Sequence, residues 1–138
     1  MGTTFQADVP GNVYHHTMSF ASRASNAADD VIDFFHALGH TVSVLSVYYV
    51  PHISQAGSAT NYDDWKLINM GSGSAGTAVV ASKTFSATGA SVQAETPSSL
   101  SVASAAIASN EHLGISRVSA GNGIALVAHT IHMAYRYT

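Results

Sequence analysis

Residues 41 to 50 read TVSVLSVYYV, and Pro51 follows them directly. Threonine, valine and tyrosine are residue types that favour the pleated, half-buried surface of a β-strand. Proline has no backbone N–H to donate to a neighbouring strand, so Pro51 marks the point where this strand ends. The stretch therefore predicts a β-strand, and it is the strongest such signal in the chain.

Upstream of this strand, the segment Val13 to Phe20 (VYHHTMSF) alternates apolar and polar residues with a period of two. Pro10, Gly11 and Asn12 form a turn signal in front of it. Successive side chains of a strand point to opposite faces. The predicted inner face consists of Tyr14, His16, Met18 and Phe20.

Downstream of Pro51, the same period recurs in runs that turn residues separate. The predicted strands are residues 62–69, 77–86, 100–108, 111–118 and 124–137. We expect 77–86 to lie antiparallel to 62–69 across the loop Gly71 to Gly76, and 100–108 to pair with 111–118 around a turn at Asn110. Gly121-Asn122-Gly123 predicts the last turn. The expected core face of the last strand holds Val127, His129, Ile131, Met133, Tyr135 and Tyr137.

One segment, Asn26 to Gly39 (NAADDVIDFFHALG), fits two structures. Asn26 suits a helix N-cap, and Gly39 suits the left-handed residue that ends a helix. The apolar pairs within the segment equally fit a buried strand, because periodicity does not decide so short a run. A short helix near residues 27–38 and a strand there are therefore both carried forward.

The chain has 138 residues, which predicts one domain with one core. Seven or eight short strands and no helical layer predict an all-β antiparallel β-sandwich of jelly-roll type over residues 1–138. Residues 1–10 have no apolar face and are expected to form an extended N-terminal arm. Only 9% of residues are charged, and 22 Ala, 19 Ser and 11 Thr take their place, which favours surfaces that contact protein.

The formal net charge is -3, and basic residues form no run, so nucleic acid is not expected as a partner. No stretch approaches 18 consecutive apolar residues and no signal peptide is recognisable, so we expect no membrane partner and a cytoplasmic protein unless a larger assembly carries it. The eight histidines would raise the net charge steeply in mild acid. If several are buried and neutral at an interface, assembly is expected to weaken near pH 5.

The sequence offers no catalytic motif, so we expect neither an enzyme nor a cofactor. The adjacent His15 and His16 point to opposite faces of a strand, and so do His129 and His132, so neither pair is expected to bind a metal. His16 and His129 could meet only if their strands brought them together. The loop Gly71 to Gly76 lacks the features of a nucleophile elbow or a phosphate loop and is interpreted as a hairpin loop. Three acidic residues, Asp29, Asp30 and Asp33, lack the glycine and glutamate of a calcium loop.

Trp65 beside Asp63 and Asp64 allows a second hypothesis, a sugar site in which the indole is a stacking platform. A single tryptophan on an alternating strand is more often part of the core. Exposed positions for Tyr48, Tyr49 or Tyr62 would keep carbohydrate binding open.

Three stretches together resemble small virion proteins of tailed bacteriophages. They are Thr41 to Pro51 (TVSVLSVYYVP), Ala59 to Phe85 (ATNYDDWKLINMGSGSAGTAVVASKTF) and Val118 to Tyr137 (VSAGNGIALVAHTIHMAYRY). The resemblance spans roughly the last 100 residues, and its most distinctive pieces are Ala-Thr-Asn-Tyr, Asn-Met-Gly and Gly121-x-Gly123.

This resemblance implies a capsid cement or decoration protein, a jelly-roll module without catalysis that binds the outside of an icosahedral head. It implies the major capsid protein and a second or third copy of the chain (a homodimer or homotrimer) as partners, and the virion surface as location after assembly in the host cytoplasm. The expected contacts come from Thr3, Thr4, Phe5, Tyr135 and Tyr137. The alternative is a receptor- or carbohydrate-binding head or tail module of a virion.

Overall fold

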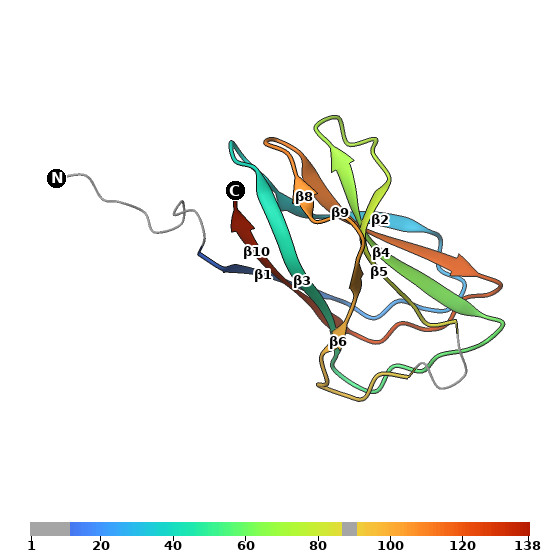
Figure 1. Cartoon of the computed structure of the whole chain (residues 1–138). Coiled ribbons are helices and arrows are strands. Elements are labelled where there is room, and N and C mark those ends of the chain that lie inside the picture. The colour runs from blue at the N-terminus through green and yellow to red at the C-terminus, as the bar shows by residue number, and fades with distance from the viewer. Residues whose placement is uncertain (1–11, 87–90) are drawn as a thin grey trace.

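The computed structural model describes residues 12–86 and 91–138, and the regular elements within these ranges are all β-strands (Figure 1). The strands are β1 (Tyr14–Phe20), β2 (Asp30–His36), β3 (Val42–Pro51), β4 (Tyr62–Gly71), β5 (Ala78–Thr84), β6 (Ser98–Ser99), β7 (Ser101–Val102), β8 (Ala106–Ile107), β9 (His112–Ala120) and β10 (His129–Tyr137). The prediction of an all-β chain is confirmed.

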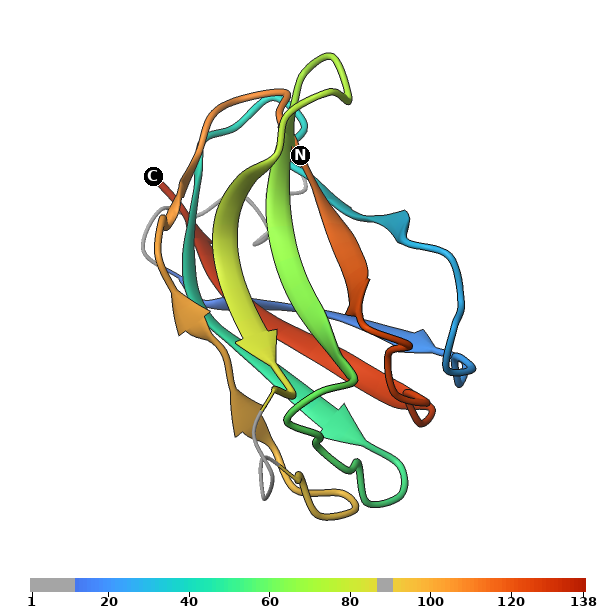
Figure 2. The ribbon, with the colours of Figure 1, turned by 90° about the vertical axis from the view of Figure 1, so that its right-hand side faces the viewer.

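The strands form two antiparallel sheets that pack against each other (Figure 2). The first sheet has the order β1-β10-β3-β6, and β8 also pairs with β3. The second has the order β2-β9-β4-β5-β7. The short strands β6 and β8 share one position beside β3, so the order is that of a jelly roll, and the predicted β-sandwich is confirmed.

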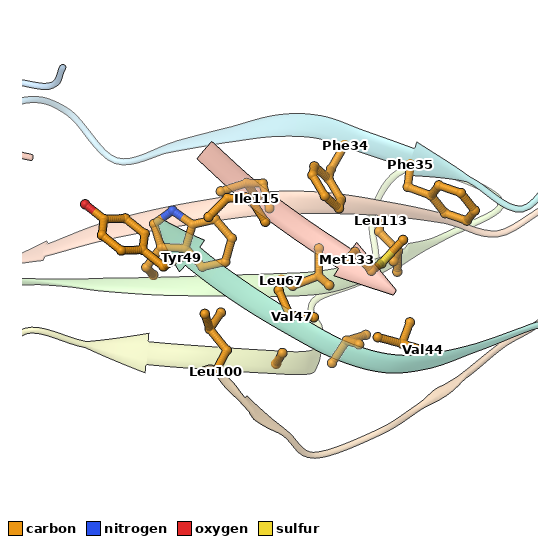
Figure 3. Close-up of a cluster of buried hydrophobic side chains, with 14 of the residues drawn as sticks. Phe34, Phe35, Val44, Val47, Tyr49, Leu67, Leu100, Leu113, Ile115 and Met133 are labelled. Carbon is orange, nitrogen blue, oxygen red and sulfur yellow. The ribbon is translucent and has the colours of Figure 1, made fainter. Parts of the chain in front are cut away.

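The core lies between the inner faces of the two sheets (Figure 3). In β3, Val42, Val44, Val47 and Tyr49 are buried. The alternation shifts by one residue at Leu45, where the register between β3 and β10 is interrupted by a bulge. From the second sheet, buried side chains such as Trp65, Leu67, Leu113 and Ile115 complete the core.

The predicted faces of the first and last long strands are also confirmed. In β1, residues 14, 16, 18 and 20 are at least partly buried, and the residues between them are exposed. In β10, His129, Ile131 and Met133 are buried, and Tyr135 and Tyr137 are partly buried. Val127, the remaining residue of the predicted face, precedes the strand and is only partly buried. This strand begins at His129 and not at Ile124, because residues 124–128 leave the ladder and form a single bridge from Leu126 to Arg23.

The helix considered for residues 27–38 is wrong, and the alternative of a strand is confirmed. β2 pairs with β9 along its length, and a bulge between Asp33 and Phe35 interrupts the register. Phe34 and Phe35 are consequently both buried, which a regular alternation would not allow. Asn26, the expected N-cap, instead adopts a positive φ of 63° in the turn before the strand.

The predicted hairpin of 100–108 with 111–118 is wrong as well. β8 pairs with β3 in the first sheet, whereas β9 lies between β2 and β4 in the second. Asn110 does form a turn, with a φ of 67°, but this turn carries the chain from one sheet to the other. The hairpin of β4 with β5 across the loop Gly71 to Gly76 is confirmed.

Candidate interaction surfaces

Charged residues are divided very unequally between the two sheets. Among the described strands of the first sheet, one residue is an aspartate, glutamate, lysine or arginine, namely Arg136. The strands of the second sheet carry Asp30, Asp33, Asp63, Asp64, Lys66, Lys83 and Arg117. The two outer surfaces of the sandwich therefore offer a partner quite different chemistry.

The outward residues of β1, β10 and β3 form one continuous surface, which we call the charge-poor face. It consists of His15, Thr17, Ser19, Thr130, His132, Ala134, Arg136, Ser43, Leu45, Ser46, Tyr48 and Val50. The register aligns Thr17, His132 and Tyr48 in one row across the three strands. Tyr48 keeps 38% of its surface exposed, so a large aromatic ring stands at the middle of a surface without acidic residues.

A shallow hollow interrupts the charge-poor face beside this ring. It is lined by Tyr48, Val50, Pro97 and His132, and its volume is about 490 Å³. Next to it, Thr130 is held by hydrogen bonds of 3.0 Å with Ser19 and with the ring of His52. The hollow offers mainly apolar side chains and one imidazole, which suits an apolar side chain of a protein partner.

Tyr135 and Tyr137, two of the predicted contact residues, lie at the edge where β1 and β2 bring the two sheets together. The ring of Tyr135 is 5.8 Å from Tyr14, 4.8 Å from Phe35 and 5.8 Å from Tyr137. Burial, aided by a hydrogen bond with Tyr137, raises the pKa of Tyr135 to about 12. Both side chains are partly buried and pack against the core. Thr3, Thr4 and Phe5, together with the predicted arm, lie outside the described residues.

A buried polar cluster lies at the opposite end of the second sheet. Asp63 accepts hydrogen bonds from Arg23 and from the hydroxyl of Ser119, at 3.1 Å and 2.7 Å. Arg117 forms a two-pronged ion pair with Asp30, and this pair lowers the pKa of the carboxyl group. Asp29 accepts a hydrogen bond from the backbone of Ser119. Asp63 and Asp29 thus tie the segment before β2 and strand β4 to Ser119 of β9, and Asp30 ties β2 to Arg117 of β9.

The sugar site built on Trp65 is wrong in two of its three residues. Trp65 and Asp63 are completely buried, so neither can meet a ligand from solvent. Of the three tyrosines considered for its rim, Tyr48 is exposed and Tyr62 is half-buried, whereas Tyr49 is buried and donates a hydrogen bond of 3.2 Å to Gln55. Asp64, which points the other way on β4, is the one member of the set that reaches a surface groove. The core interpretation of Trp65 is confirmed.

Of the eight histidines, only His112 and His129 are buried. The hypothetical meeting of His16 with His129 does not occur, because the register places His129 opposite Phe20 and His16 opposite Met133. His129 lies between Phe20 and Tyr49, with ring centroids at 5.2 Å and 4.7 Å. Burial lowers its pKa to about 4, so this histidine is neutral at physiological pH.

His112 and His36 stack with their ring centroids 4.9 Å apart. His112 also contacts the hydroxyl of Ser74 at 3.1 Å and a carboxylate oxygen of Asp33 at 3.9 Å. Within residues 12–86 and 91–138, however, no three histidine, aspartate or glutamate side chains gather closely enough to hold a metal ion. The same ranges contain no helix that is long and apolar enough to cross a membrane.

The fold and these surfaces define a jelly-roll sandwich with one charge-poor and one charged sheet. Comparison with known proteins adds no family: no family model, curated protein or solved structure matches the chain. The charge-poor face itself was not predicted from the sequence. The sequence does show that Val42–Pro51 contains no charged residue and that His129–Tyr137 contains one. That these two strands are neighbours and form one surface could not be predicted from the sequence.

Proposed function

We propose that the chain is a structural virion protein that binds the outside of an icosahedral phage head and stabilises it, without catalysing a reaction. The observation that carries the proposal is the charge-poor face on β1, β10 and β3. The resemblance of three stretches of the sequence to small phage virion proteins and the jelly-roll order of the strands support it.

The composition of this face favours contact with protein. The centres of protein interfaces are depleted in charged residues and enriched in aromatic residues, because an unpaired charge is costly to desolvate. Tyr48 lies at the centre of the face, and Arg136 lies toward its end, where it pairs in register with Ser43. This arrangement gives a central row, Thr17, His132 and Tyr48, that a partner can cover without burying an acidic group.

The partners in this proposal are the major capsid protein and further copies of the chain, as a homodimer or homotrimer on the virion surface. A stable contact buries about 800 Å² on each partner. Many copies on one shell act together, since each tie between neighbouring subunits becomes more effective when others hold the same subunits in place. Weak single contacts can then resist the pressure of packaged DNA.

The test is co-sedimentation of the purified protein with phage heads that lack it. Tyr48→Glu introduces a charge at the centre of the charge-poor face and is expected to abolish binding to the heads. Val118→Glu is the matched control, because Val118 is equally exposed at 37%, compared with 38% for Tyr48, but belongs to the second sheet. Its binding is expected to equal that of the unmodified protein.

The proposal fails if the unmodified protein does not sediment with the heads. It also fails if Tyr48→Glu binds normally while Val118→Glu does not, since the second sheet would then carry the contact. Light scattering behind size-exclusion chromatography on the same three proteins gives the number of copies in solution. A dimer or trimer that Tyr48→Glu reduces to a monomer would assign contacts between copies to the same face.

A further inference from the structure

A polar groove lies where β5 and the segment 98–102 part from each other. Ser101 pairs with Ser82 of β5 in the second sheet, whereas Ser99 pairs with Tyr48 of β3 in the first. The segment therefore changes sheets within a few residues (Figure 2). The resulting groove has a volume of about 380 Å³, and its lining residues are Asp64, Lys66, Ser82, Lys83, Thr84, Ser99 and Ser101.

Every one of these side chains is polar, which distinguishes this groove from the hollow on the charge-poor face. Four of them are the hydroxyl residues Ser82, Thr84, Ser99 and Ser101, each able to donate and to accept a hydrogen bond. No aromatic ring lines the groove for a nucleobase to stack on, and no aliphatic side chain lines it for a lipid tail. The ligand that fits such a lining is polar over its whole surface.

The groove also gathers both lysines of the molecule, Lys66 and Lys83. Arg23 and Arg117 are buried and ion-paired, and Arg136 lies on the other sheet. With the carboxylate of Asp64, the groove carries a formal charge of about +1, which matches a ligand with a single negative charge.

The strand register starts the two lysines on opposite sides of the second sheet, and both side chains line the groove at the edge of β5. Lys66 pairs with Ser82, so both side chains leave the same outer side of the second sheet. Lys83 pairs with Trp65 and so starts on the inner side of β5, and its ammonium group lies 5.5 Å from the centre of the Phe85 ring. Partial burial lowers the pKa of Lys83, which means that its charge is incompletely solvated before any ligand arrives.

We propose that this groove binds an acidic saccharide unit, a sugar ring that carries one carboxylate. The ammonium groups of Lys66 and Lys83 pair with the carboxylate, and Asp64 and the surrounding hydroxyls bind the hydroxyl groups of the ring. A ligand with several phosphates fits less well, because Asp64 repels its additional charge and arginine, which binds phosphate with two hydrogen bonds, is absent from the lining.

This inference does not depend on the proposed docking on a phage head, since most of the groove lining comes from β4 and β5 of the second sheet, and Ser99 alone pairs with the charge-poor face. Asp64 was part of the hypothetical sugar site in the sequence, but the lysines and serines that complete the groove were not. A virion protein with such a groove would bind a glycan through its second sheet while the charge-poor face of its first sheet contacts the capsid.

Titration of the isotope-labelled protein with sodium glucuronate, followed by NMR, tests the inference. Glucose serves as the neutral sugar, and inorganic phosphate serves as the anion without a ring. We expect glucuronate at about 10 mM to shift the signals of the groove residues, because single sugar units bind with millimolar dissociation constants. Glucose and phosphate are expected to bind at least about tenfold more weakly, since each lacks one half of the recognised chemistry.

Lys66→Gln is expected to weaken glucuronate binding about tenfold, because one charge-assisted hydrogen bond is lost. Lys66→Arg keeps the charge and is expected to retain most of the affinity. Arg136→Gln, which removes an exposed cation from the other sheet, is the control and is expected to bind normally.

Three outcomes would overturn the inference. The first is the absence of glucuronate binding at this concentration, and the second is phosphate binding as tight as that of glucuronate. The third is equal weakening by Lys66→Gln and Arg136→Gln, which would indicate a general effect of net charge. An unchanged thermal midpoint of Lys66→Gln excludes misfolding as the cause of a loss.

Discussion

A guanidinium nitrogen of Arg23 lies 3.1 Å from a carboxylate oxygen of Asp63, and the two side chains are 4% and 0% exposed. The pair joins the segment before β2 to strand β4. Arg23 also donates to the carbonyls of Ala27 and Ala28, at 3.1 Å and 2.6 Å, which fixes the turn that leads into β2. This buried ion pair therefore stabilises the connection from β1 in the first sheet to β2 in the second.

Arg23→Met should lower the free energy of unfolding by about 3–5 kcal/mol, because it leaves the Asp63 carboxylate buried without its cation. Chemical denaturation at pH 7 measures the change. Arg136→Met, on the surface, is the control and should alter stability by less than about 0.5 kcal/mol.

The double variant Arg23→Met with Asp63→Leu should recover a large part of this loss, since it removes both charges and leaves an apolar pair. A double variant that is less stable than Arg23→Met would mean that the hydrogen bond of Asp63 with Ser119 outweighs the ion pair. That result would contradict our account of the cluster.

Two glycines have similar backbone conformations but different surroundings. Replacing each by alanine therefore distinguishes the cost of the left-handed backbone from the cost of steric crowding. Gly39 and Gly123 have φ values of 75° and 61°, a region that disfavours other residues. A Cβ atom at Gly39 would have nothing within 4 Å, whereas at Gly123 it would lie 2.9 Å from the Ser119 hydroxyl and 3.1 Å from Asp63.

Gly39→Ala should therefore destabilise the protein by about 1–2 kcal/mol, the cost of the left-handed backbone alone. Gly123→Ala should cost at least about 1 kcal/mol more, because Ser119 must move away from the carboxylate that it holds. Thermal unfolding of both variants measures the difference. Equal losses of stability in the two variants would contradict this prediction. They would show that Ser119 and Asp63 accommodate the added methyl group at no cost in free energy.

The fold was predictable from period-two patterns wherever one face of a strand is buried and the other is exposed. The segment Asp30 to His36 resisted this approach, because the bulge before Phe35 buries two consecutive phenylalanines and breaks the alternation. The segment 98–107 resisted it for another reason. Its strands have two residues each and change sheets between Ser99 and Ser101, so their partners depend on contacts far away in the sequence.

The surfaces were less predictable than the fold because they depend on which strands are neighbours. The alternation of side chains along β3 predicts the face to which Tyr48 points. That Thr17 and His132 are its neighbours across the sheet follows only from the strand order β1-β10-β3. The groove requires Lys66, Ser82 and Ser101 to lie in one row, which the registers of β4 with β5 and of β5 with β7, together with one change of sheet, bring about. Local propensity carries no information about either relationship.

The protonation of His129, which is buried in the core, makes the stability of the fold depend on pH. Its Nδ1 lies 2.8 Å from the Val127 carbonyl, which only accepts hydrogen bonds, so Nδ1 carries the proton of the neutral ring. Nε2 is buried, and no hydrogen-bond partner for it occurs in the described parts of the chain. A second proton on Nε2 would therefore place an unpaired charge between Phe20 and Tyr49.

Stability should consequently fall in mild acid. Burial holds the pKa of His129 at about 4 in the folded protein, below its ordinary value of 6.5, so the unfolded chain takes up the proton first. The stabilising contribution is complete above pH 6.5 and is lost as the pH falls to about 4, with a total of about 3 kcal/mol at 1.4 kcal/mol for each pKa unit. Denaturation curves at pH 7, 5.5 and 4.5 should show this loss in the unmodified protein and in His132→Gln, whose histidine is exposed. His129→Gln should show a much flatter dependence whatever its stability at pH 7, and an unchanged slope in that variant would assign the acid sensitivity to other groups.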